Sequence, residues 1–549
     1  MNYDPQEPRF DQVGTRDREV DRREFLRRAG ILGASAAASL GSLAQPAPSG
    51  GLGVAIAEAD SGPSQLTIRL TSDISNLDPA FEPADPDLQT MFNIYENLVS
   101  FKPGTFDLVN TLANQWEPSS DKLSYHFKLK KGIEFHQNFG EVTADDVKFS
   151  FERIAGLTTP NLNSPYQGNW SALERVEVTD KYTGVIHLKH PYAPLMTLTI
   201  PGNPGHIVSR KAVEKLGNSF ATNPIGTGPY EFAKWAPQQF VLLTKFAKYS
   251  GASSQYAAAP IWDEIRMNVI GNDQAAGIAL QSGAVDFTQI PLTAVKQFQS
   301  SGLGVTKRTQ FGYKWIGMNL EDPLFQDVNL RLAIRYAIDV PGILAAAFEG
   351  LWPQATAIIP PSMPIGYWKE APQYEQDIAK ATSYLAKTGL KNPTINMTYD
   401  LTEPGGSTVA QVVQQNLQSI GISVNVQGVE DGAFLVTGSA AQMQRHLFYA
   451  GYGSQADPAQ SMQWFTCKQL NLWNYMYWCD NTFTSLASQG QTETDPGKRQ
   501  QIYVELQEIW DKAANAVWVA WPTVYFAQKM GITPSLRPDG RIIAWNFRA

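Results

Sequence analysis

Hydrophobic and polar positions along the chain divide it into many short elements. Residues 66–70 (LTIRL) alternate apolar and polar side chains, which predicts a half-buried strand. In residues 408–420 apolar side chains recur at helical spacing and a glycine follows at 421, which predicts an amphipathic helix. Runs at 394–400 and 422–426 flank this helix and predict strands. A strand–helix–strand unit predicts parallel pairing within an α/β lobe.

The same patterns predict elements on both sides of this unit. Residues 231–235 and 240–246 follow a Gly-Pro turn and predict two strands. Residues 377–388 predict a helix, with Gly389 as its C-terminal cap, and residues 499–513 predict another helix. Thr143, followed by Asp146, has the spacing of a capping box in an acidic form, so a helix should begin there.

Length and composition indicate a globular protein of more than one domain. A chain of 549 residues is too long for a single hydrophobic core. Its content of 43% hydrophobic and 17% charged residues is that of a folded protein. The net charge of −8 argues against a nucleic-acid partner, because binding phosphates requires a basic surface.

The N-terminal residues 1–57 have the features of a targeting segment. Arg22 and Arg23 precede Phe25-Leu26, and a weakly apolar run of Ala, Gly and Ser covers 29–44. This order resembles the twin-arginine export signal S/T-R-R-x-F-L-K, with Asp21 in the first place and Arg27 in that of lysine. The resemblance implies export by the twin-arginine translocase, with cleavage after Ala44 or, preferably, Ala57.

The two cysteines, Cys467 and Cys479, are compatible with a metal pair, a redox pair or a disulfide. Zinc would need two more ligands and a shorter spacing. The six histidines are scattered, and only His187 and His190 lie near each other, so we assign all six structural roles. We therefore predict no metal and no cofactor.

The stretch from 449 to 479 concentrates tyrosine and tryptophan, with both cysteines and little charge. Such residues bury large areas at a low entropic cost. A Gly-Tyr-Gly-Ser turn and the step Asp457-Pro458 interrupt it, so it is not one continuous helix or strand. Two interpretations remain open: an aromatic wall beside a small-ligand site, or an ordinary aromatic core.

Several short sequence motifs occur in a fixed order within residues 66–549. They resemble those of the family 5 extracellular solute-binding proteins of ABC importers, which bind dipeptides, oligopeptides or nickel. The matching blocks are NLDP at 76–79, YENL at 95–98, LANQW at 112–116, YHFKLKKGIEFH at 125–136, TADDVKFSFER at 143–153, PIGTGPY at 224–230, GAVD at 283–286 and GMN at 317–319.

The resemblance implies an α/β fold of two lobes, the type II or venus-flytrap periplasmic binding protein, with an extra subdomain on lobe I. Lobe I would comprise residues 58–95, 222–313 and 522–549, the subdomain 96–221 and lobe II 314–521. Hinge crossings would lie near 314–317 and 520–522. The protein would be a periplasmic monomer that closes around its ligand and is then recognised by the membrane permease.

The resemblance also nominates a binding site. In the family's peptide binders, the Asp of a G-W-x-x-D motif pairs with the ammonium group of the peptide. In this chain Tyr452 occupies the position of the Trp. The chain has one residue fewer in the motif, so Ser454 falls at or beside the position of the Asp. Asp457 either replaces this anchor or caps the turn before Pro458. The family's disulfide matches Cys467 and Cys479. The full set of predicted ligand-binding residues is Tyr452, Gly453, Ser454, Asp457, Trp473, Trp478, Trp315 and Asn319.

The ligand that the resemblance implies is a peptide, with oligosaccharides, opines and metal chelates as alternatives because the ammonium anchor is missing. A partner of a sensory receptor is a further alternative. An exported enzyme is the remote one, since G-x-S-x-G, H-E-x-x-H and clustered metal ligands are absent from the sequence. We therefore predict no catalytic residues.

Overall fold

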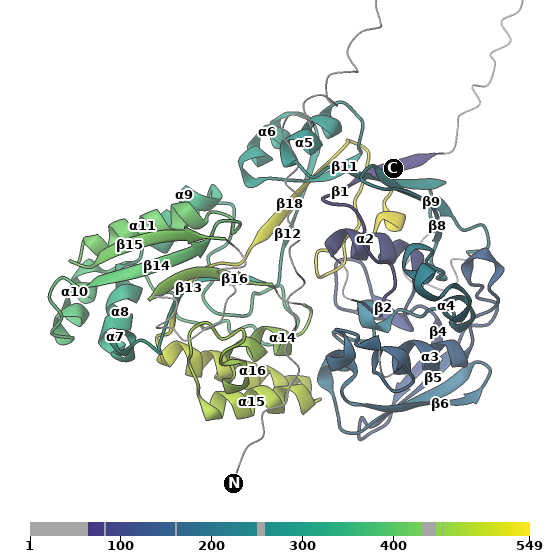
Figure 1. The fold of residues 1–549 in the computed structure, drawn as a ribbon, viewed down its shortest axis with the longest axis horizontal. Coiled ribbons are helices and arrows are strands. Elements are labelled where there is room, and N and C mark those ends of the chain that lie inside the picture. The colour runs from purple at the N-terminus through teal and green to yellow at the C-terminus, as the bar shows by residue number, and fades with distance from the viewer. Residues whose placement is uncertain (1–63, 82–83, 160–161, 250–258, 431–445, 454) are drawn as a thin grey trace, which may run out of the picture. The chain divides into compact units, whose positions relative to one another are not determined.

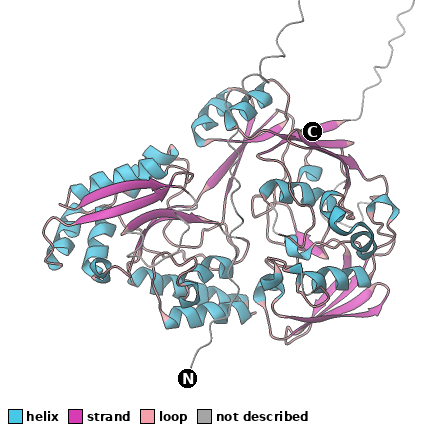
Figure 2. Cartoon of the chain, in the orientation of Figure 1, coloured by secondary structure: helices cyan, strands magenta, loops and turns pink. Residues whose placement is uncertain are grey.

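The computed structural model describes residues 64–81, 84–159, 162–249, 259–430, 446–453 and 455–549 (Figures 1 and 2). The proposed export signal and Ser454 lie outside these residues. Within the described ranges, no helix combines the length and apolar character needed to cross a membrane.

A seven-stranded sheet brings together three distant parts of the chain, in the order β12-β18-β11-β1-β10-β9-β8. Its central strand β1 is parallel to both neighbours, β10 and β11, whereas β9 and β18 run antiparallel to theirs. The strands are β1 (Gln65–Leu70), β8 (Tyr230–Ala236), β9 (Phe240–Lys245), β10 (Glu264–Val269), β11 (Phe287–Ile290), β12 (Gly304–Thr309) and β18 (Thr523–Gln528). Helices α5 (Asp273–Gln281) and α6 (Val295–Ser300) belong to this region.

The chain between β1 and β8 forms a separate antiparallel sheet in the order β4-β5-β7-β6. Its strands are β4 (Ala113–Pro118), β5 (Ser124–Leu129), β6 (Leu173–Asp180) and β7 (Thr183–Leu188), and a small hairpin is formed by β2 (Val99–Phe101) and β3 (Leu108–Asn110). The helices are α2 (Asp85–Ile94), α3 (Ala144–Ile154) and α4 (Arg210–Leu216). The predicted capping box of Thr143 and Asp146 is confirmed at the start of α3.

The remaining sheet has five strands in the order β15-β14-β16-β13-β17. They are β13 (Tyr313–Met318), β14 (Thr394–Asp400), β15 (Ser423–Val429), β16 (Leu447–Tyr452) and β17 (Ala516–Ala520). The helices are α7 (Pro323–Gln326), α8 (Val328–Ala337), α9 (Val340–Phe348), α10 (Ile378–Lys387), α11 (Gly406–Gln418), α14 (Pro458–Met462), α15 (Asn481–Thr492) and α16 (Pro496–Lys512). Because β14 and β15 pair in parallel on either side of α11, the predicted strand–helix–strand unit is confirmed.

The two faces of the five-stranded sheet pack against different layers because successive strand residues point to opposite faces. Ile316 and Met318 of β13 join a core built with α8, α9, α10 and α11. Tyr313 and Trp315 of the same strand join an aromatic core built with α14, α15 and α16. In Figure 1, α9 and α11 appear on one side of this sheet and α14 to α16 on the other.

The chain passes between the five- and seven-stranded sheets through two short connections. One comprises residues 310–312, between β12 and β13, and the other residues 521–522, between β17 and β18. The first connection lies just before the crossing predicted near 314–317, and residues 314–317 themselves lie inside β13, where they pair with both β16 and β17. The second connection overlaps the crossing predicted near 520–522.

Candidate ligand-binding site

Three parallel strands of the five-stranded sheet end at the same edge. β14 is parallel to β15 and β16, so their carboxyl ends, Asp400, Val429 and Tyr452, lie together. Since β13 begins and β17 ends at this edge, both connections to the other sheet also meet it. Open α/β sheets bind ligands outside the carboxyl ends of their strands. We call this edge the carboxyl edge, and it is the candidate site.

Tyr452 and Gly453 lie at the carboxyl edge, as a ligand-binding role requires. The Tyr452 ring is half-buried, with its centroid 4.7 Å from that of Trp315 and 5.7 Å from that of Trp464. Its hydroxyl donates to the backbone carbonyl of Trp473. Gly453 is exposed, and no atom lies within 4 Å of the place that a Cβ would take. This segment therefore offers an aromatic edge and open backbone.

The three predicted tryptophans have different environments. Trp315 is 0% exposed and supports Tyr452 from within the aromatic core. Trp478 is also buried, with its ring 4.9 Å from that of Trp510. Only Trp473 is substantially exposed, at 44%. For Trp315 and Trp478, burial favours a role in the core over contact with a ligand.

Asp457 is fully buried and its oxygens are already engaged. One carboxylate oxygen lies 2.6 Å from Nη2 of Arg499 and accepts from the backbone N–H of Ala459 at 2.9 Å. The other accepts from the hydroxyl of Thr197. Burial alone would lower the pKa of Arg499, but the charges of Asp457 and Tyr503 and their hydrogen bonds to the guanidinium together hold that pKa above its ordinary value. Asp457 thus caps α14, the second of its two predicted roles, and its carboxylate is not presented to a ligand.

Asn319 lies at the other end of the sheet from Tyr452, so the structure does not bring these two predicted site residues together. β13 runs antiparallel to β16, so Asn319, which follows Met318, comes beside His446 at the start of β16. The length of one strand, about 20 Å, separates it from Tyr452. Its side chain accepts from the backbone N–H of Glu321 and stabilises a turn.

Cys467 and Cys479 are joined by a disulfide in the structure, and their Cα atoms lie 4.7 Å apart. The bond closes the segment that carries Trp473. Within the described part of the chain, no three His, Cys, Asp or Glu side chains gather as metal ligands would.

The sequence interpretation missed an ion pair at the carboxyl edge. Lys314, the second residue of β13, pairs with Glu403 in the turn after β14, and each side chain is 15% exposed. Glu403 belongs to a Glu-Pro-Gly-Gly turn that directly follows a predicted strand. An acid in the loop that follows a parallel strand was therefore the sequence signal from which this ion pair could have been predicted.

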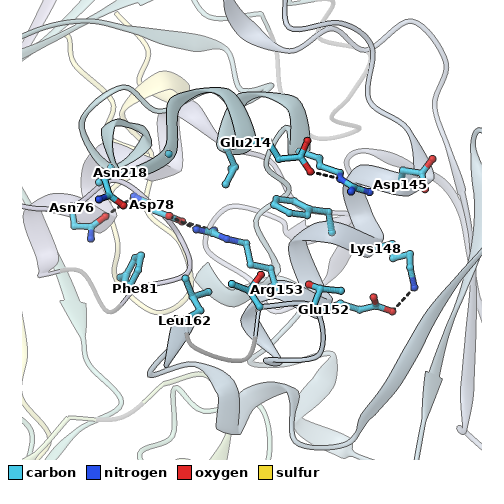
Figure 3. Close-up of a pocket in the computed structure, with 17 residues that line it drawn as sticks. Asn76, Asp78, Phe81, Asp145, Lys148, Glu152, Arg153, Leu162, Glu214 and Asn218 are labelled. Carbon is cyan, nitrogen blue, oxygen red and sulfur yellow. Dashed lines mark hydrogen bonds and ion pairs between the residues drawn. The ribbon is translucent and has the colours of Figure 1, made fainter.

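A cavity of about 680 Å³ lies away from this edge, between residues 76–81, α3 and the region of α4 (Figure 3). None of the predicted site residues lines it. Its three cationic side chains each pair with an acid of the cavity: Arg153 with Asp78, Lys148 with Glu152 and Arg210 with Glu214. None of these residues lies at the carboxyl edge, so we do not place the ligand there.

The model of the bacterial extracellular solute-binding proteins, family 5, matches residues 107–471. The chain is 26% identical to the dipeptide-binding protein of Escherichia coli over 79% of this chain and 84% of that protein. It is 28% identical to the glutathione-binding protein GsiB of Pectobacterium atrosepticum, over 82% and 87% of the two chains. These relatives are binding proteins rather than enzymes.

Solved structures of periplasmic binding proteins have the same fold as this chain. The periplasmic binding protein DppA of Helicobacter pylori, in complex with the peptide STSA, is 25% identical, with a TM-score of 0.71 over 88% of this chain and 98% of that one. The substrate-binding protein CtaP of Listeria monocytogenes, 21% identical, has a TM-score of 0.78 over 88% and 99%. The predicted fold, a two-lobed α/β periplasmic binding protein, is confirmed.

Proposed function

The chain belongs to the bacterial extracellular solute-binding proteins of family 5, and from this premise we propose that it captures a short peptide for an ABC importer. One observation supports this location of the site: at the carboxyl edge, Tyr452 and Gly453 lie beside the turn after β14 and both connections to the other sheet. The names of the relatives, which include dipeptide- and glutathione-binding proteins, support a peptide as the class of ligand.

In this proposal the lobes divide as the sequence suggested: lobe I at 58–95, 222–313 and 522–549, its subdomain at 96–221 and lobe II at 314–521. The seven-stranded and five-stranded sheets support the division, because each draws its strands almost entirely from one set of ranges. Rotation about the connections at 310–312 and 521–522 would close the lobes on the ligand. No bond is broken, and the protein is not an enzyme.

Residues 1–57 would direct export by the twin-arginine translocase, and the mature protein would act as a periplasmic monomer that the permease recognises in its closed form. The twin arginines at 22 and 23 support this route.

A second class of ligand is favoured by one observation: the loop after β16 offers no free acid, because Asp457 is engaged by Arg499. A neutral or anionic ligand, such as an oligosaccharide, an opine or a metal chelate, would need no acid there. The ligand screen below includes these classes.

A thermal-shift screen of the mature protein tests the proposal. At about 100 times its dissociation constant a ligand adds about 2.7 kcal/mol of stability, a readily measured rise in melting temperature. The panel comprises di- and oligopeptides, oligosaccharides, opines and nickel chelates. We expect peptides to raise the melting temperature. A rise with another class alone would overturn the peptide assignment. If no compound acts, mass spectrometry of the supernatant after denaturation identifies any ligand that was purified with the protein.

A further inference from the structure

A peptide ligand raises a problem of charge at the carboxyl edge. Its ammonium group loses water on binding, and a desolvated cation needs an acidic partner. Ser454 carries no charge, and Asp457 is 0% exposed and bound to Arg499. The counter-charge would then come from a different acid.

Glu403 meets this requirement. It follows the carboxyl end of β14, and its side chain retains 15% exposure, in contrast to the fully buried Asp457. Its partner, Lys314, also 15% exposed, lies on the strand β13 that pairs with β16, where Lys314 faces Gly451 in the register. The pair thus adjoins the segment of Gly451, Tyr452 and Gly453.

Two backbone features adjoin this pair. A Cβ on Gly451 would collide with the side chain of Lys314, so the glycine allows Lys314 to cross β16 and reach Glu403. The pairing of β13 with β17 also shifts register between Lys314 and Trp315. Such irregularities re-aim side chains and are common beside functional sites.

The turn that carries Glu403 is held in place by several hydrogen bonds. The backbone N–H of Glu403 donates to the carbonyl of Asp400 at 3.0 Å, and that of Gly406 donates to the carbonyl of Glu403 at 3.0 Å. The Asp400 carboxylate accepts from both the N–H and the hydroxyl of Thr402, each at 2.7 Å. A turn fixed in this way loses little further entropy when a ligand binds.

We propose that Glu403 binds the ammonium group of the peptide and that Lys314 binds its carboxylate. This inference rests on the proposed peptide function and names the residues that select a zwitterion. Before binding, each charge compensates the other, and a ligand with both charges replaces both partners at once. A ligand that carries only one of the charges would leave Lys314 or Glu403 without compensation, so blocked peptides should bind more weakly.

The test uses the mature protein and an equimolar dipeptide library in three forms: free, N-acetylated and C-amidated. The protein is separated from unbound peptides, and the retained peptides are quantified by mass spectrometry. We expect the wild-type protein to prefer free over N-acetylated dipeptides by about thirtyfold or more. In Glu403→Gln this preference should fall to about one, and in Lys314→Met the preference for free over C-amidated peptides should fall likewise.

The matched control is Asp286→Asn. It neutralises an acid of comparable burial, 13% exposed and paired with Lys529, at the amino end of β11 in the other sheet. It should retain the wild-type preference. Gly451→Ala provides a second test, because it removes no charge but displaces Lys314, and it should weaken discrimination against C-amidated peptides.

The outcomes separate the two proposals. If the wild-type protein retains free dipeptides and Glu403→Gln keeps the same preference, the assignment of Glu403 is overturned while the peptide function stands. If the wild-type protein retains no dipeptide in any form, the peptide function fails and the inference fails with it. Melting curves of every variant identify any that has not folded.

Discussion

The substitution Asp457→Asn distinguishes two roles of this residue: an anchor for the ligand, or one partner of a buried ion pair. It preserves the size of the side chain and removes its charge. In the structure Asp457 is 0% exposed and Arg499 is 3% exposed at the side chain, with 2.6 Å between the charged atoms. The change would therefore leave a buried guanidinium without its counter-charge.

The expected loss of stability follows from this burial. Removing one partner of a buried ion pair costs about 3–5 kcal/mol. If the lobe of about 200 residues unfolds as one unit, the melting temperature should fall by about 6–20 °C. The affinity for the ligand found in the screen should change by less than about threefold, because the carboxylate is not presented to it.

Differential scanning calorimetry and titration calorimetry on the same samples measure both quantities. The double variant Asp457→Leu with Arg499→Met should be less destabilised than the sum of the single variants, because replacing both charges removes the uncompensated one. Glu214→Gln, which breaks a pair of more than half-exposed side chains, should melt like the wild-type protein. An Asp457→Asn protein with an unchanged melting temperature and lost ligand binding would refute the reasoning.

Further predictions concern the disulfide and two buried titrating groups. Replacing Cys467 and Cys479 by alanine should lower the free energy of unfolding by about 3 kcal/mol, and thiol titration of the native protein should find no reactive thiol. Burial lowers the pKa of His136 to about 4, below its unfolded value of about 6.5. The stability that this buried neutral imidazole contributes is therefore fully present above pH about 6.5, and up to about 3 kcal/mol of it is lost as the pH falls towards 4. Urea titrations of His136→Gln at several pH values should lack this part of the pH dependence. Burial would raise the pKa of Asp539, but Arg537 and Arg541 lower it to about 2. Its contribution is present above pH about 4 and is lost as the pH falls towards 2, so Asp539→Asn should be less stable at neutral pH and lose less on acidification.

Local patterns predicted local structure well. The alternation of residues 66–70 corresponds to β1, and the helical spacing of residues 408–420 corresponds to α11 within two residues. The Thr143 capping box marks the start of α3. Each of these signals acts over a few residues, so the physics that produces the element can be read from a short segment.

Strand direction and the choice of ion-pair partner could not be read in this way. Asn319 and Tyr452 both adjoin strands of one sheet, but β13 and β16 are antiparallel, which places them at opposite ends. The aromatic density of residues 449–479 likewise did not reveal that Trp478 faces Trp510 in the core whereas Trp473 is 44% exposed. These differences depend on which faces meet after folding.

The two acids at the carboxyl edge illustrate the same limit. Asp457 and Glu403 each lie in the loop after a parallel strand, and each is followed by proline. The partner of Asp457 is an arginine of α16, 42 residues later, in a fully packed core. The partner of Glu403 is a lysine 89 residues earlier, at the partly exposed end of β13. An acid whose counter-charge is buried with it stabilises the lobe, whereas an acid whose counter-charge reaches solvent can exchange that partner for a ligand.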